Sequence, residues 1–187
     1  MMARLRLGRV VLARALTCAL VAIALAGCSG KPGLGGQESE GFASGWSRVD
    51  VPLPTATGRM KRIGIAGPSR VNPDHIVIIN FWSSTCGPCK KEMPLFERLS
   101  HAGFPVVGVS RDNIVKYARQ EILARGITFP NYSDASADVM FGLRKVLYPN
   151  GIPTTVLVRE GRVRWVHIGA FSSYAELRGS VASRMTP

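Results

Sequence analysis

The chain has 187 residues, with 24 lysines and arginines against 12 aspartates and glutamates, so its formal net charge is +12. The basic residues are scattered along the sequence rather than clustered, which argues against a nucleic acid as partner. The length suits one domain with a real hydrophobic core, and the sequence contains no internal repeat and no second domain boundary.

The first 27 residues have the order of an export signal. Four arginines and no acidic residue occupy the first fourteen positions, and an almost wholly apolar run follows from Ala15 to Ala26. Such a run is too short to span a bilayer as a mature helix. Residues 1–27 are therefore interpreted as a cleaved signal peptide. An uncleaved anchor, or a signal peptide with a chance cysteine at its end, is the alternative.

The apolar run ends in Leu25-Ala26-Gly27-Cys28, which resembles the lipobox of bacterial lipoproteins. The resemblance implies that Cys28 is lipidated and becomes the first residue of the mature chain. Residues 28–45 are rich in Gly, Ser and Glu, a composition that cannot bury enough apolar area to fold. We expect them to form a flexible tether between the outer face of the cytoplasmic membrane and a domain at residues 46–187.

The domain is predicted to begin with a weak strand, a buried strand and a helix. Residues 59–65 are a weak strand candidate, whereas residues 75–82 form a continuous β-branched and aromatic run suited to the centre of a sheet. A helix follows at about residues 86–101, bent by Pro94. Three side chains offer capping hydroxyls before it: Ser83, Ser84 and Thr85.

A second buried strand is expected at residues 105–110, followed by a helix capped by Asp112 or Asn113 and stopped by Gly126. Three apolar residues share one face of that helix: Ile114, Ala118 and Ile122. A loop at residues 129–133 leads to Asp134, which can cap a short helix. That helix carries Val139, Met140 and Leu143.

The C-terminal part is expected to form a hairpin and a helix. Residues 154–159 and 162–168 alternate apolar and polar positions across Glu160-Gly161, which is typical of a β-hairpin. A final amphipathic helix is expected at about residues 173–183. The order of strand, helix, strand, helix, hairpin and helix predicts an α/β sandwich with a mixed sheet.

Cys86 and Cys89 would be the free thiols of the mature domain, because Cys18 leaves with the signal peptide and Cys28 is acylated. A Cys-x-x-Cys that opens a helix places its first sulfur at the positive end of the helix dipole, where the thiolate is favoured. We therefore predict Cys86 as the nucleophile and Cys89 as the resolving cysteine of a mixed disulfide.

A zinc site is the alternative for such a pair, but it needs two further ligands from Cys or His. The three histidines, His75, His101 and His167, fall in isolated contexts. We therefore expect no metal and no cofactor beyond the redox-active cysteine pair.

Residues 80–94 (Asn-Phe-Trp-Ser-Ser-Thr-Cys-Gly-Pro-Cys-Lys-Lys-Glu-Met-Pro), with Gly151-Ile152-Pro153-Thr154 downstream, resemble the thioredoxin-like superfamily and more closely its extracytoplasmic TlpA/ResA-like branch. The resemblance covers about residues 47–185. It implies a three-layer sandwich with a mixed central β-sheet flanked by helices. It also implies a cis peptide before Pro153, with the cysteine pair beside it and the backbone of Ile152 offered to an extended substrate.

The resemblance extends to the surroundings of the cysteines. Glu92 follows Cys89 by one helical turn and matches a glutamate that tunes the thiols in this branch; a carboxylate there would raise the thiol pKa and relay a proton. A solvated charge beside Lys90 and Lys91 is the alternative. Asn80 stands where cytoplasmic thioredoxins carry a buried acid, and Thr85 replaces an aromatic residue at the rim. Three further residues support the site in this interpretation, with Trp82 packed beneath it: Trp82, Gly87 and Pro88.

Residues and resemblance together imply a monomeric, lipid-anchored, extracytoplasmic thiol-disulfide oxidoreductase. It would take electrons from a thiol-type membrane donor and reduce disulfides of exported proteins such as apocytochrome c. Oxidation or isomerisation during the folding of exported proteins stays open, because direction depends on redox potential. A thiol peroxidase would need a threonine where Ser83 stands, and a copper-binding chaperone would need Cys-x-x-x-Cys spacing with a distal histidine.

Overall fold

The computed structural model describes residues 44–64, 76–148 and 151–186. In these parts of the chain, seven strands form one mixed sheet in the order β1-β7-β6-β3-β4-β5-β2. Its strands are β1 (Gly45–Pro52), β2 (Lys61–Ile63), β3 (Val77–Trp82), β4 (Val106–Ser110), β5 (Asn131–Ser133), β6 (Thr154–Arg159) and β7 (Arg162–Ile168). The predicted signal peptide, the lipidation site Cys28, the tether up to residue 43, and His75 lie outside the described residues.

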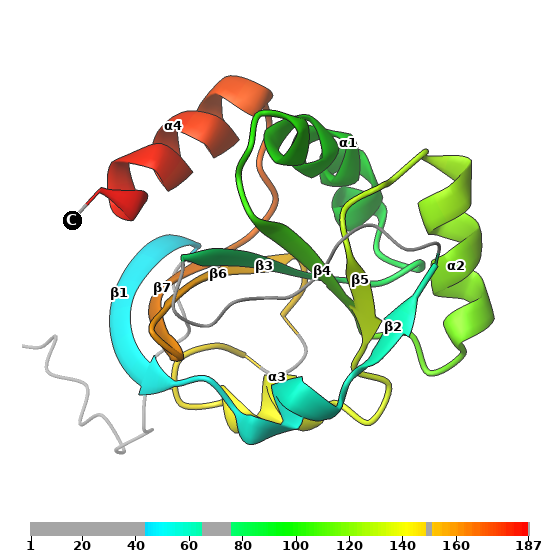
Figure 1. The fold of residues 1–187 in the computed structure, drawn as a ribbon, viewed down its shortest axis with the longest axis horizontal. Coiled ribbons are helices and arrows are strands. Elements are labelled where there is room, and N and C mark those ends of the chain that lie inside the picture. Colours follow the sequence, from blue (N-terminus) through cyan, green and yellow to red (C-terminus); the bar gives the residue numbers. More distant parts are fainter. Residues whose placement is uncertain (1–43, 65–75, 149–150, 187) are drawn as a thin grey trace, which may run out of the picture. The chain divides into compact units, whose positions relative to one another are not determined.

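Helices cover both faces of the sheet (Figure 1). One face carries α1 (Gly87–His101), α2 (Val115–Ala124) and α4 (Tyr174–Met185), and the other carries α3 (Asp138–Gly142) and the 3₁₀ helix η1 (Thr55–Arg59). The three-layer α/β sandwich with a mixed sheet is therefore confirmed. Among the described residues, no helix is both long and apolar enough to cross a membrane.

Strand β3 forms the centre of the sheet and separates the two halves of the core. It runs parallel to β4 and antiparallel to β6, and all six of its residues are buried. Side chains of Ile78 and Trp82 pack in the cluster beneath α1, whereas Ile79 and Phe81 pack in the cluster beneath α3. This alternation follows from the two-residue period of a strand. Because β3 leads directly into α1, the rigid centre of the sheet positions the cysteine pair.

Helix α2 and strand β6 end at the residues that the sequence analysis predicts. Gly126 has φ +60° after α2, and the amides of Gly126 and Ile127 donate to the carbonyls of Leu123 and Ile122, the pattern of a Schellman cap. Glu160 and Gly161 both have positive φ, 54° and 68°, as the type I′ turn between β6 and β7 requires. The hairpin and the glycine stop are therefore confirmed.

Other capping predictions are wrong. Helix α2 begins at Val115 after Ile114, and no side chain caps it; Ile114 is 55% exposed instead of sharing the buried face. Helix α1 is capped by the sulfur of Cys86 rather than by a serine or threonine hydroxyl. Asp134 does accept hydrogen bonds from the first turn of α3, from the amides of Val139 (3.1 Å) and Met140 (3.2 Å).

Two strands were not predicted. β1 begins at Gly45, the last residue of the predicted tether, and pairs antiparallel with β7. β5 lies in the predicted loop at residues 129–133 and pairs with β4 on one side and β2 on the other. The weak strand candidate is divided between the end of η1 and the short strand β2. These corrections extend the sheet at both edges and leave its centre unchanged.

Candidate active site

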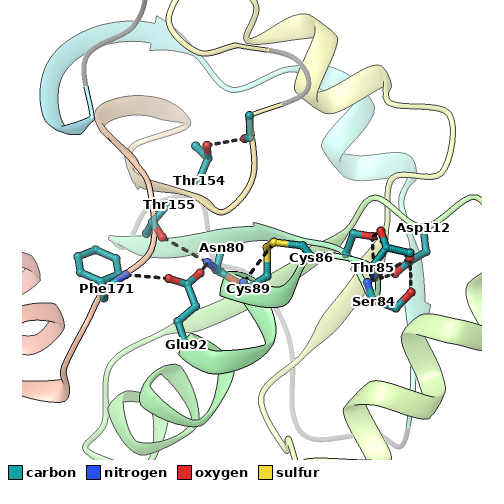
Figure 2. Close-up of a disulfide and its surroundings, with 12 residues drawn as sticks. Asn80, Ser84, Thr85, Cys86, Cys89, Glu92, Asp112, Thr154, Thr155 and Phe171 are labelled. Carbon is teal, nitrogen blue, oxygen red and sulfur yellow. Dashed lines mark hydrogen bonds between the residues drawn. A yellow bond between two sulfur atoms is a disulfide. The ribbon is translucent and has the colours of Figure 1, made fainter.

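A disulfide joins Cys86 and Cys89 at the start of α1 (Figure 2). Cys86 is the N-cap residue and is half-buried, whereas Cys89 is completely buried one turn further on. The sulfur of Cys86 accepts a hydrogen bond from the amide of Cys89 over 3.2 Å. Gly87 and Pro88, between the cysteines, are exposed. A partner approaching this end of the helix therefore meets Cys86 and not Cys89.

The position of Cys86 favours its anionic form. The first amides of a helix have no intrahelical acceptor, and the helix dipole is positive at this end. Pro88 fits in the first turn because its missing amide hydrogen would have no partner there. A thiolate at Cys86 would accept the same amide hydrogen bond that the disulfide sulfur accepts.

Glu92 lies one turn after Cys89 and is completely buried. Its Oε1 accepts from Asn80 Nδ2 over 2.8 Å, and its Oε2 accepts from the amide of Phe171 over 3.1 Å (Figure 2). Burial raises the pKa of this carboxyl from 4.5 to about 7, although the two hydrogen bonds oppose that shift. The alternative of a solvated surface charge is therefore wrong.

Asn80 connects Glu92 to the centre of the sheet. Its Nδ2 also donates to Thr155 Oγ1 over 3.4 Å, because Asn80 on β3 pairs in register with Thr155 on β6. Its Oδ1 is buried and, within the described residues, has no hydrogen-bond partner. In Figure 2 the Asn80 side chain lies between Cys89 and Glu92. This buried amide therefore joins Glu92 on α1 to Thr155 on β6.

The loop before β6 contains the predicted cis proline. The Ile152–Pro153 peptide bond is cis, Pro153 is buried, and the hydroxyl of Thr154 donates to the carbonyl of Gly151 over 2.7 Å. Cys86 and Ile152 both pack against the core cluster beneath α1. The predicted conformation is confirmed, and the role of this loop in binding a substrate stays a prediction.

Trp82 forms part of the floor beneath the site. It is completely buried, and its Nε1 donates to Asn131 Oδ1 on β5 over 2.9 Å. Asn131 is fixed in turn because its Nδ2 donates to the carbonyl of Phe129 over 3.0 Å. This arrangement confirms that Trp82 packs in the core.

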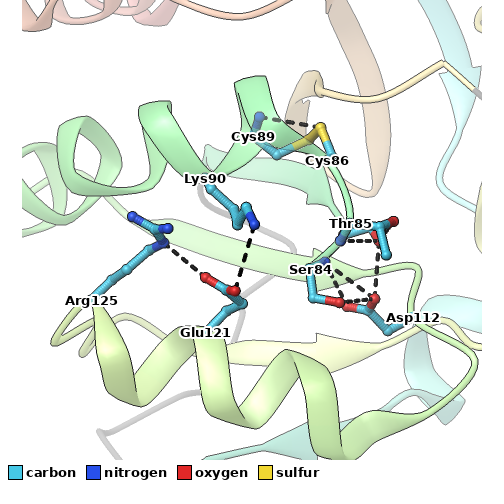
Figure 3. Close-up of polar contacts among 9 residues, drawn as sticks. Ser84, Thr85, Cys86, Cys89, Lys90, Asp112, Glu121 and Arg125 are labelled. Carbon is cyan, nitrogen blue, oxygen red and sulfur yellow. Dashed lines mark hydrogen bonds and ion pairs between the residues drawn. A yellow bond between two sulfur atoms is a disulfide. The ribbon is translucent and has the colours of Figure 1, made fainter.

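Asp112 is a site residue that sequence reasoning missed. Its carboxylate accepts from the hydroxyl (2.6 Å) and the amide (3.0 Å) of Ser84 (Figure 3). It also accepts from the hydroxyls of Ser83 (3.0 Å) and Ser110 (2.8 Å). Ser84 and Asp112 follow the ends of the parallel strands β3 and β4, which meet at one edge of the sheet. Asp112 therefore fixes the turn that leads into Cys86.

Lys90 is the cation next in sequence to Cys89, and its charge is directed toward α2. Its Nζ lies 3.7 Å from Glu121 Oε1, and Arg125 Nε lies 3.1 Å from Glu121 Oε2 (Figure 3). Exposed pairs of this kind contribute little stability. The pairs nevertheless place the Glu121 carboxylate beside the cation of Lys90.

The described residues contain no group of three or more His, Cys, Asp or Glu side chains that could hold a metal ion. His101 contacts Glu97 over 2.8 Å at the far end of α1, and His167 stacks on Phe171 with ring centroids 4.1 Å apart. Neither histidine is paired with the cysteine pair in these contacts. The chemistry that the geometry supports is that of the two sulfurs.

Two known proteins with similar sequences are named thiol-disulfide oxidoreductases. ResA, a thiol-disulfide oxidoreductase of Halalkalibacterium halodurans, is 29% identical over 103 residues, which cover 51% of this chain and 55% of ResA. Sporulation thiol-disulfide oxidoreductase A of Bacillus subtilis is 29% identical over 130 residues, 65% of this chain and 76% of that protein. The chain thus spans about half the length of the ResA relatives that it matches.

The fold has solved counterparts. A thioredoxin-family thiol:disulfide interchange protein of Chlorobium tepidum superposes with a TM-score of 0.58 at 20% identity, covering 75% of this chain and 99% of the other. That likeness shows a shared thioredoxin-like fold. The model of the AhpC/TSA family matches residues 67–166, which is more than half of the sequence. The chain therefore belongs to the AhpC/TSA family of thioredoxin-like proteins.

Proposed function

We propose that this protein is a thiol-disulfide oxidoreductase that exchanges its Cys86–Cys89 disulfide with cysteine pairs of other proteins. The observation that carries the proposal is the asymmetry of the pair: a half-exposed Cys86 at a helix N-terminus and a completely buried Cys89. The names of the ResA and sporulation relatives support the same activity. The exchange needs no cofactor, because the electrons move with the sulfur–sulfur bonds.

In the reducing direction, the Cys86 thiolate attacks one sulfur of the partner's disulfide. A mixed disulfide forms, and one partner cysteine leaves as a thiolate. The Cys89 thiolate then attacks the sulfur of Cys86, which closes the Cys86–Cys89 bond and releases the second partner thiolate. The protein loses two electrons and the partner gains them.

Glu92 is the group that would accept the proton of the Cys89 thiol. Cys89 is buried, so its thiol must lose a proton inside the protein before it attacks Cys86. The pKa of Glu92 is about 7, so its carboxyl can accept a proton at neutral pH, and it lies one turn further along the same helix. Asn80 would orient this carboxyl through the hydrogen bond to Oε1.

We further propose that the protein acts outside the cytoplasm as a monomer, anchored through Cys28. Disulfides of exported proteins such as apocytochrome c would be its substrates, and a thiol-type membrane protein would reduce it. The lipobox-like sequence at residues 25–28 supports this assignment. Oxidation or isomerisation by the same site is the alternative, because the chemistry of exchange runs in both directions.

The equilibrium potential of the Cys86/Cys89 couple in glutathione buffers tests the direction. A value near that of thioredoxin, about −270 mV, is expected for a reductase, whereas a value near about −120 mV indicates an oxidant. The Cys89→Ser variant is the control, because it cannot form the intramolecular disulfide. Rapid consumption of hydrogen peroxide without any thiol partner would instead point to a peroxidase.

A further inference from the structure

A cavity lies away from the cysteine pair, at the sheet edge formed by β1. It has a volume of about 550 Å³ and is lined by residues of β1, of the β6–β7 hairpin and of the C-terminal end of α4. In Figure 1 this edge is at the left, where the red end of α4 lies above the cyan strand β1. The residues of the disulfide site do not contribute to its lining.

The lining of this cavity carries excess positive charge. Four arginines, Arg48, Arg159, Arg164 and Arg184, face two acidic residues, Asp50 and Glu160, which leaves a formal charge of +2. Arg164 lies 2.8 Å from Asp50 and 3.6 Å from Glu160. Within the described residues, the other three arginines make no ion pair. Arg159 Nη2 donates to the carbonyl of Met185 over 2.9 Å, and Arg184 Nη1 donates to the carbonyl of Ser180 over 2.7 Å. These acceptors are neutral, so the positive charges of the three arginines stay uncompensated by a carboxylate and can attract an anion that enters the cavity.

Aromatic rings hold two of these arginines, Arg48 and Arg184, in place. The guanidinium of Arg184 lies 4.7 Å from the ring centroid of Trp46 and 5.0 Å from that of Trp165, and Arg48 lies 6.0 Å from Trp165. Arg184 Nε is buried and has no hydrogen-bond partner among the described residues, and burial lowers the pKa of this guanidinium. A guanidinium that is fixed and partly dehydrated loses less on binding an anion than a mobile one.

The cavity also has an apolar wall. Leu157 is a buried residue of the lining, and Trp165 and Ile76 contribute further apolar surface. Cavities of this size hold small organic molecules rather than a bare ion. Aromatic and aliphatic surface next to arginines suits a ligand with a charged end and an apolar body.

We propose that this cavity binds an organic phosphomonoester, with the phosphate held by Arg48, Arg159 and Arg184 and the apolar body lying against Trp165. A phosphomonoester carries a charge of about −1.5 to −2 at neutral pH, which matches the +2 of the lining, whereas a carboxylate would neutralise only half of it. The planar guanidinium also fits phosphate oxygens with paired hydrogen bonds. This site is independent of the disulfide exchange.

Titration calorimetry with n-hexyl phosphate tests the proposal on the domain with its disulfide intact, and the indole resonance of Trp165 reports the site. We expect binding at least tenfold tighter than that of inorganic phosphate, and no binding of n-hexanol. Arg48→Gln and Arg184→Gln should each weaken binding at least tenfold. Arg119→Gln, which removes an exposed arginine of α2, is the matched control and should bind as the wild type does.

The proposal is overturned if hexyl phosphate does not bind, if inorganic phosphate binds equally well, or if Arg119→Gln weakens binding as much as Arg48→Gln. Arg184 packs on two tryptophans, so a failure of its variant to fold leaves the decision to the exposed Arg48. Dihexanoyl phosphatidic acid distinguishes the source of the phosphate. Tighter binding than that of hexyl phosphate assigns the site to a lipid, and weaker binding assigns it to a soluble ester.

Discussion

Glu92→Gln removes a buried titratable group while preserving the size of the side chain, and its effect on stability is expected to depend on pH. The carboxyl has a pKa of about 7 in the folded protein and an ordinary value of 4.5. Between these values the folded state holds a proton that the unfolded chain has released. The stability of the wild type therefore falls as the pH rises from 4.5 to about 7.

The magnitude follows from the pKa difference. At about 1.36 kcal/mol for each pH unit, the loss amounts to about 3 kcal/mol across this window. Glutamine does not titrate, so the variant lacks this loss. It has a cost of its own, because both Asn80 Nδ2 and the amide of Phe171 donate to the carboxyl and glutamine offers one acceptor oxygen. That cost is about 1–3 kcal/mol and is the same at every pH.

Urea unfolding of the oxidised protein, followed by circular dichroism from about pH 4 to about pH 8, measures both terms. We expect the wild type to be the more stable protein at low pH and its advantage to shrink or reverse at high pH. Glu121→Gln, a matched change at the surface pair with Lys90, should keep the pH profile of the wild type. Parallel profiles for the wild type and Glu92→Gln would refute the pKa assignment and the proton role built on it.

Further predictions concern the surroundings of the site and the anchor. Glu92 has a pKa of about 7, so above that pH its carboxylate disfavours a thiolate nearby. Glu92→Gln removes this charge and should lower the thiol pKa values of the reduced protein, as measured by the pH dependence of alkylation. Asp112→Asn should destabilise the turn before Cys86 by about 1–3 kcal/mol and slow the exchange with a model disulfide, measured by stopped flow. Gly108→Ala should lower stability by at least about 1–3 kcal/mol in urea unfolding, because its Cβ would collide with the carboxamide of Asn131 beneath Trp82. Cys28→Ser should release the domain from the membrane fraction or leave it as an uncleaved precursor; unchanged membrane association with normal processing would contradict the lipidation site.

The parts of the fold that sequence predicts well are those set by neighbouring residues. A cysteine pair three residues apart at the start of a helix fixes its own geometry, and the structure places both sulfurs as expected. Glu160-Gly161 satisfies the positive φ values of a tight hairpin turn, so the turn could be placed from two residues. The central strand β3 is identifiable from the sequence because all of its residues except Asn80 are apolar, and the structure buries all six.

The parts that sequence could not predict depend on distant partners. β5 has three residues, Asn131–Ser133, and is a strand because β4 and β2 supply hydrogen bonds on either side. Asp112 resembles a helix cap by its position, but its carboxylate bonds to a turn that lies 28 residues earlier in the sequence. The basic residues look scattered for the same reason, because β1, the β6–β7 hairpin and α4 bring four of them to one cavity.

The burial of Glu92 also depends on a distant partner and could not be predicted from the sequence. Its spacing from Cys89 predicts the correct helix face, but the sequence leaves open whether that face is solvated beside Lys90. The answer comes from Phe171, whose segment before α4 closes over the carboxyl and donates its amide to it. No local pattern indicates that contact.

The central claim is that Cys86 attacks the partner and that Cys89 resolves the mixed disulfide. Trapping of the reduced single-cysteine variants with an oxidised partner protein, analysed by mass spectrometry under nonreducing conditions, tests this claim most directly. Because Cys86 is the exposed sulfur, Cys89→Ser should accumulate a covalent complex through Cys86, and Cys86→Ser should accumulate little. Equal trapping by the two variants, or trapping through Cys89 alone, would contradict the account.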